Sequence, residues 1–61
     1  MAMNKYILKE VSSYWYVKSL NPFTLTSGER EALTFTYEEA QRVIYLYGLG
    51  EKYDILQKIE M

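Results

Sequence analysis

The 61-residue sequence contains no cysteine and no histidine, and it has only one proline and three glycines. Without cysteine the chain cannot form disulfides. Without either residue it cannot build a zinc finger, a c-type haem attachment or a catalytic pair that uses histidine. No stretch reaches the roughly 18 apolar residues that a transmembrane helix needs. The net charge of −1 provides no bulk attraction to nucleic acid or to an anionic membrane. These absences favour a non-enzymatic protein that holds no cofactor and no metal.

Length and composition predict a single domain over residues 1–61. A chain of this size buries only about 60% of the surface that its unfolded form exposes, so we expect a thin core. Apolar residues make up 49% and charged residues 25% of the chain, which is typical of a globular domain. Met1-Ala2 ahead of Met3 is interpreted as a cloning leader. The first ten residues lack a signal-peptide pattern, which predicts a cytoplasmic location.

Two runs rich in aromatic and β-branched residues open the chain and predict a β-hairpin. They are residues 5–11 and 14–20, with Ser12-Ser13 between them. Alternation along the second run places Trp15 and Val17 on the core face. The other face of that strand would carry Tyr14, Tyr16, Lys18 and Leu20. Alternation does not decide which face of the first strand is buried.

The clearest element is a helix over about residues 36–47. Thr36 and Glu39 match a capping box, in which each residue satisfies the peptide N–H of the other. Apolar residues recur on one helical face at Ala40, Val43, Ile44 and Tyr47. Gly48 is placed to end the helix in the left-handed conformation, and Leu49 is placed to complete a Schellman motif.

The remaining segments complete a β-β-(β)-α-β order. Residues 23–26 form either a short strand or an extended connection, and residues 53–59 alternate like a final strand, with Tyr53, Ile55 and Ile59 on one face. This order predicts an α+β fold with a small sheet of three to four strands and one helix packed on one face. The second sheet face would then be uncovered.

The aromatic content points to protein binding. Ten residues, 16% of the chain, are aromatic, and each buries roughly 150–250 Å², more in total than a thin core can enclose. Tyrosine and tryptophan are enriched at protein interfaces. We therefore predict a small protein-binding module whose partner is another protein or a second copy in a homodimer. Its interface candidates are Tyr14, Tyr16, Leu20, Tyr37 and Tyr45.

Two alternatives remain open. The first is a single-stranded nucleic-acid-binding protein, because the hairpin combines lysines that neutralise phosphates with aromatic rings on which bases stack. Its candidate residues are Lys5, Lys9, Lys18, Tyr14 and Tyr16. The second alternative is a structural component of a larger assembly. The bland explanation, that aromatic residues simply favour strands, also stands.

The predicted hairpin is followed by a stretch that opens the helix, residues 32–40, with the sequence ALTFTYEEA. A glycine and the final strand come next, in residues 48–55. This order of hairpin, capped helix and final Tyr-x-Ile strand resembles small orphan proteins of phages and prophages of Gram-positive bacteria. The resemblance implies a phage accessory protein, one that modulates the host or counters its defences by binding. It transfers no functional residue to this chain.

Overall fold

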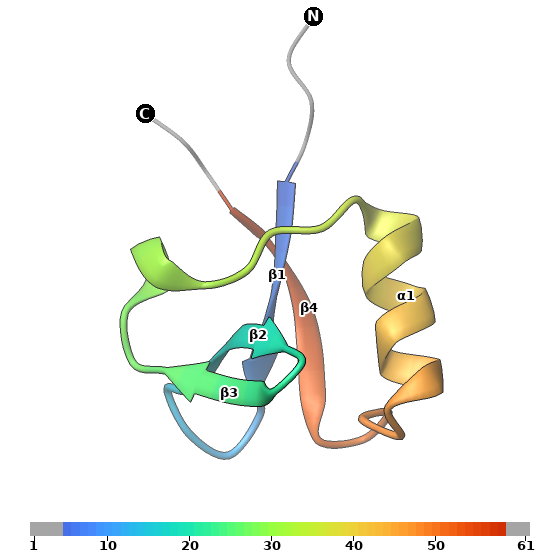
Figure 1. Cartoon of the computed structure of the whole chain (residues 1–61), viewed down its shortest axis with the longest axis horizontal. Coiled ribbons are helices and arrows are strands. Elements are labelled where there is room, and N and C mark those ends of the chain that lie inside the picture. The colour runs from blue at the N-terminus through green and yellow to red at the C-terminus, as the bar shows by residue number, and fades with distance from the viewer. Residues whose placement is uncertain (1–4, 59–61) are drawn as a thin grey trace, which may run out of the picture.

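A computed structural model describes residues 5–58, which form one antiparallel sheet and one α-helix (Figure 1). The strands are β1 (Lys5–Glu10), β2 (Tyr16–Leu20), β3 (Phe23–Thr26) and β4 (Tyr53–Lys58). Between β3 and β4 lie a 3-10 turn, η1 (Glu29–Glu31), and the helix α1 (Tyr37–Leu46). The sheet order is β3-β2-β1-β4, and all neighbours are antiparallel.

This arrangement confirms the α+β class and the predicted order of elements. Residues 23–26 form a strand, which decides the question that the sequence left open. Tyr53 is buried and Ile55 packs against the core, as the alternation of the last strand predicts. Ile59 and the Met1-Ala2 leader lie outside the described residues.

The helix α1 begins and ends where the sequence predicts. Thr36 Oγ1 accepts a hydrogen bond from the Glu39 peptide N–H at 3.1 Å, and Glu39 Oε1 accepts one from the Thr36 peptide N–H at 2.9 Å. The capping box is therefore complete. At the other end Gly48 has a φ of +64°, and the Leu49 N–H donates to the Ile44 carbonyl at 2.9 Å. This bond, which reaches back five positions along the chain, is the one expected of a Schellman motif.

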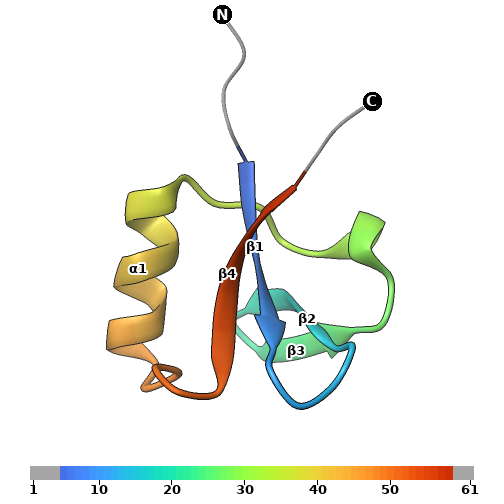
Figure 2. The ribbon, with the colours of Figure 1, turned by 180° about the vertical axis from the view of Figure 1, so that it is seen from behind.

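The strand β1 is buried on both faces. Ile7 and Leu8 point to opposite faces of the sheet, and both are 0% exposed. On one side of the sheet lies the core cluster of Leu8, Val17, Phe35, Ala40, Val43, Leu49 and Tyr53. The β3–α1 connection, whose Ala32 is also buried, begins at η1 on the opposite side of the β1–β4 ladder from α1 and crosses β1 before it enters the helix (Figures 1 and 2). The expectation of an uncovered second face is therefore wrong at the centre of the sheet.

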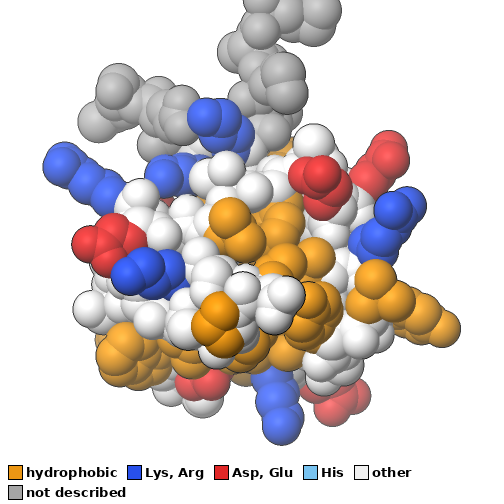
Figure 3. All heavy atoms as spheres, in the orientation of Figure 1, with side chains coloured by type: hydrophobic (Ala, Val, Ile, Leu, Met, Phe, Trp, Pro, Cys, Tyr) orange, Lys and Arg blue, Asp and Glu red, His pale blue; other side chains and the backbone are white. Residues whose placement is uncertain are grey.

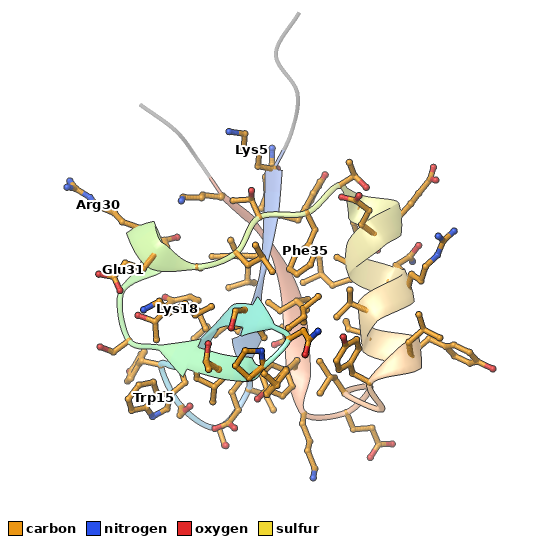
Figure 4. The ribbon with its side chains drawn as sticks, viewed as in Figure 1. Lys5, Trp15, Lys18, Arg30, Glu31 and Phe35 are labelled. Carbon is orange, nitrogen blue, oxygen red and sulfur yellow. The ribbon has the colours of Figure 1, made fainter. Side chains whose placement is uncertain are left out.

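Trp15 does not share the core face with Val17, and that part of the hairpin prediction is wrong. Its side chain is 46% exposed and points away from the sheet (Figure 4). Strand geometry begins only at Tyr16, and Trp15 belongs to the loop, where its carbonyl accepts a hydrogen bond from the Glu10 N–H at 2.9 Å. Alternation applies only within a strand, so it correctly places Val17, which is fully buried, and misplaces the residue before β2.

A β-bulge in β2 also corrects the predicted position of Leu20. The register with β3 shifts by one residue between Val17 and Ser19, which makes Lys18 the extra residue. A one-residue shift exchanges the two faces for every residue beyond it. Leu20 therefore packs against the core cluster, as Val17 does, and does not lie on one face with Tyr16.

We expect Gly48→Ala to lower the free energy of unfolding by about 1–2 kcal/mol, because a side chain is strained in the left-handed region that Gly48 occupies. Gly50→Ala is the matched control. A Cβ at either glycine meets no atom within 4 Å, but Gly50 does not have a positive φ, so its variant is expected to be nearly neutral. Urea unfolding followed by circular dichroism measures the difference. Equal losses in the two variants would contradict this account of the helix end.

Candidate interaction site

An apolar groove lies between α1 and the extended segment that leads into it. In Figure 3, hydrophobic side chains gather at the centre of the visible face, next to the helix. The groove has a volume of about 400 Å³, within the range of pockets that receive ligand groups. It is lined by Leu20, Leu33, Thr34, Phe35, Glu39, Arg42, Val43 and Leu46.

The central strands β1 and β2 hold the apolar walls of the groove in place. Leu20 reaches it because of the β2 bulge. Phe35 exchanges two backbone hydrogen bonds with Tyr6, each 2.8 Å long, and its side chain lies between β1 and α1 (Figure 4). The Leu33 N–H donates to the Val17 carbonyl at 2.9 Å. The segment that forms one wall is thus bonded to both central strands and does not depend on α1 for its position.

The rim of the groove carries charge and one strongly exposed apolar side chain. Glu39 and Arg42 lie three positions apart on α1, so they occupy neighbouring places on the helix surface. Glu39 is engaged by the Thr36 N–H at the capping box. Leu46, in the last turn of α1, is 67% exposed. A partner that enters the groove would therefore meet an apolar floor, a cationic side chain and an unburied leucine.

Of these groove residues, the sequence prediction of interface residues included only Leu20. Leu46 lies three positions after Val43, so it flanks the apolar stripe of the helix without belonging to it. An apolar residue that flanks the buried stripe of a surface helix is a signal that could have identified Leu46, and the sequence prediction did not use it. Leu33 and Phe35 carried no such signal, because their position depends on backbone bonds to strands distant in the sequence.

The predicted interface tyrosines do not form one surface. On the hairpin, Tyr14 is 81% exposed in the loop, while Tyr16 is half-buried in β2. On the helix, Tyr45 is 84% exposed and next in sequence to the groove residue Leu46. Tyr37, in the first turn of α1, instead meets an aromatic ring of β1 edge to face, with the ring centroids 5.3 Å apart.

A second group of aromatic rings joins three elements near the end of α1. Phe23 of β3 stacks on Tyr47 and meets Tyr53 of β4 edge to face, both with centroids 6.3 Å apart. Such ring pairs are worth roughly 0.5–1.5 kcal/mol beyond the area that they bury. Part of the aromatic surplus therefore serves packing, and it is not all free for a partner.

Three of the five nucleic-acid candidates come together at one end of the hairpin. Lys9 Nζ lies 5.3 Å from the centre of the Tyr14 ring, and Lys9 opposes Tyr16 in the β1–β2 register. Lys5 lies at the other end of β1, and Lys18 lies beside η1 (Figure 4). The predicted set is therefore divided into one compact group and two separate lysines.

Within residues 5–58, no group of three or more acidic side chains is placed to hold a metal ion. In the same part of the chain, no helix is long and apolar enough to cross a membrane. Comparison with protein-family models, curated proteins and solved structures finds no match to this chain. The groove and the side chains around it are therefore the features of the molecule that bear on its function.

Tyr53 links the aromatic group to the electrostatics of the sheet. Burial raises the pKa of its hydroxyl above the ordinary value, and the Glu10 carboxylate, directly opposite it in the β1–β4 register, raises the pKa further. Both causes favour the neutral phenol in the folded state. The contribution of Tyr53 to stability is therefore complete below the pKa of the unfolded chain and is lost as pH rises through the pKa of the folded one.

We expect the free energy of unfolding of the wild type to fall as the pH rises above about 10, and Tyr53→Phe to reduce that fall, because this variant has no hydroxyl to ionise. Tyr45→Phe removes a solvent-exposed hydroxyl and is the matched control, with the wild-type profile expected. Denaturant unfolding at a series of pH values gives all three profiles. Coincident profiles for the wild type and Tyr53→Phe would show that Tyr53 does not carry this dependence.

Proposed function

We propose that this protein is a small non-enzymatic module that binds another protein through the groove between α1 and residues 33–35. The observation that carries the proposal is the apolar floor of the groove with Leu46 exposed at its edge. Burying an exposed leucine contributes roughly 1.5–3 kcal/mol. Leu46 stays exposed in the folded chain, so a partner that covers it would gain this free energy of burial.

The lining of the groove defines the chemistry of the partner. A volume of about 400 Å³ admits one or two apolar side chains rather than a whole domain. Arg42 at the rim is suited to a carboxylate, since a guanidinium can bind both carboxylate oxygens at once. Tyr45, adjacent in sequence to Leu46, is of a residue type that is enriched at protein interfaces. The best fit is a partner segment with apolar side chains next to an acidic one.

The resemblance of the sequence to phage and prophage proteins of Gram-positive bacteria supports a role as an accessory protein whose partner comes from the bacterial host. Such a role requires a binding surface and no catalytic machinery, which agrees with the groove as the functional feature. The genes that surround this one would separate an accessory role from a structural role in a larger assembly.

We expect Leu46→Glu to weaken partner binding by tenfold or more, because a charge at the edge of an apolar groove must lose its water when a partner covers it. Peptides selected from a random display library on the wild-type protein serve as the probe, and their affinities for the variants are measured by titration calorimetry. Gln41→Glu, which adds the same charge at an exposed position outside the groove lining, is the matched control and should retain binding.

Two results would count against the groove. One is a library that yields no peptide with apolar residues, and the other is a set of selected peptides that bind Leu46→Glu as tightly as the wild type.

A second candidate function, binding of single-stranded nucleic acid, is favoured by the group of Lys9, Tyr14 and Tyr16. A base can stack on the exposed Tyr14 ring while the lysine meets a phosphate. Three lysines on the hairpin would give only a shallow dependence on salt. The groove remains the stronger candidate, because this group is small and has no apolar floor.

For the nucleic-acid candidate, we expect titration with a single-stranded oligonucleotide of about 16 nucleotides at low salt to quench the fluorescence of Trp15, which lies next to Tyr14 in the hairpin loop. Lys9→Glu should abolish the quenching, and Arg30→Glu, at an exposed position in η1, is the charge-matched control. An unchanged Trp15 signal at low salt removes this candidate.

A further inference from the structure

The outer side of β4 is the longer of the two edges of the sheet. The order β3-β2-β1-β4 leaves β3 and β4 at the edges, and β4 has six residues where β3 has four. In Figure 2, β4 passes in front of β1, and no other segment of the ribbon lies in front of β4. An edge strand presents peptide groups that a further strand can pair with.

The hydrogen bonds of β1 determine which peptide groups of β4 point outward. Tyr6 exchanges both of its backbone bonds with Phe35 on the β2 side, so the odd-numbered residues of β1 direct their peptide groups toward β4. In the β1–β4 register these residues oppose the even-numbered residues of β4. The peptide groups of Ile55 and Gln57 therefore point away from β1, and no other strand among residues 5–58 pairs with them.

We propose that β4 pairs antiparallel with β4 of a second copy, with the twofold axis at Leu56. In this register Ile55 opposes Gln57 of the second copy, and the two residues exchange both backbone hydrogen bonds. The twofold axis repeats the exchange, so all outward peptide groups of Ile55 and Gln57 are satisfied. Leu56 opposes itself in a non-hydrogen-bonded position, where the side chains of opposed residues lie closest.

The charges of β4 select this register. With the axis at Leu56, Asp54 opposes Lys58 of the second copy, and the symmetry makes the same pair twice. Opposite charges directly across antiparallel strands stabilise their pairing, and like charges destabilise it. An axis at Ile55 instead places Asp54 opposite Leu56, so the carboxylate meets an apolar side chain of the second copy and has only Lys9 of its own β1 across from it. Only the register centred on Leu56 satisfies the outward peptide groups and both charges together.

The side chains of β4 do not prevent its self-pairing in this register. Edge strands are often protected from self-pairing by proline or by charged side chains, lysine especially. The sequence of β4, YDILQK, has no proline and places one charge of each sign at equal distances from Leu56. Leu56 is 39% exposed, and its burial against its own copy adds an apolar contact at the centre of the pairing. Self-pairing is thus favoured by the outward peptide groups, by the two pairs of opposite charges and by the contact between the two Leu56 side chains.

Amide hydrogen exchange of the wild-type protein tests the backbone pairing directly. A six-residue edge is at the low end of interface sizes, so the protein is examined from low concentration up to about 1 mM. We expect the Ile55 and Gln57 amides to gain protection with concentration. The Leu56 amide, which faces β1, should be protected throughout and is the internal control. Protection of Ile55 and Gln57 that does not change with concentration would overturn the proposal.

A charge exchange tests the register by sedimentation equilibrium. Asp54→Lys alone and Lys58→Asp alone each create two like-charge pairs in the dimer, and each is expected to weaken self-association roughly tenfold or more. An equal mixture of the two variants restores both opposite-charge pairs and should dimerise about as well as the wild type. Association that persists in Asp54→Lys, or a mixture that remains monomeric, would overturn this register.

Amide hydrogen exchange of the wild-type protein tests the strand pairing even where a charge variant fails to fold. The proposal is also independent of the groove, because Leu46→Glu leaves β4 unchanged. That variant should lose peptide binding and keep the dimer, so failure of the dimer and failure of the groove give different results.

Discussion

The burial of β1 on both faces is the constraint on which the rest of the structure depends. Ile7 and Leu8 are consecutive and fully buried, so neither face of the central strand can be left to water. A single helix covers only the Leu8 side. The β3–α1 connection must therefore pass on the other side before it enters the helix, and in doing so it bonds Phe35 to Tyr6. The groove is a consequence of this path, because an extended segment cannot fill the whole space beside the helix it precedes.

Elements whose signals act within a few residues could be predicted from the sequence. The capping box joins Thr36 and Glu39, and the Schellman motif joins Ile44 and Leu49, so each is complete within a window of about six residues. The order of strands and helix followed from the same kind of local pattern. None of these features requires knowledge of what packs against them, which explains why both helix ends are correct.

Features that depend on distant contacts could not be predicted in the same way. The bulge at Lys18 is a property of the pairing between β2 and β3, and no residue near it in the sequence signals the shift. That shift moved Leu20 from the supposed outer face to the core. The groove likewise combines Leu20, Phe35 and Leu46, which come from three separate segments. A site built in this way is visible only after the segments are placed together.

The surplus of aromatic residues changes meaning once their contacts are known. Tyr6 with Tyr37, and Phe23 with its two neighbours, stabilise the small fold at the margins of the core. Aromatic count alone therefore overstates the surface available to a partner. The most exposed aromatic side chains are Tyr14 and Tyr45. Tyr14 lies in the hairpin loop and Tyr45 lies on α1, so they do not form one interface.

The same core contacts that hold β4 also constrain how its outer edge can be used. Tyr53 and Ile55 face the helix side of the sheet, so these two odd-numbered residues of β4 are committed to the core. In this strand the odd-numbered residues are also those whose peptide groups point outward. A strand that pairs with the edge must therefore bond to Ile55 and Gln57, and it must meet Asp54, Leu56 and Lys58 on the face away from α1. Hence the packing of β4 against the core determines which of its side chains a pairing strand would contact.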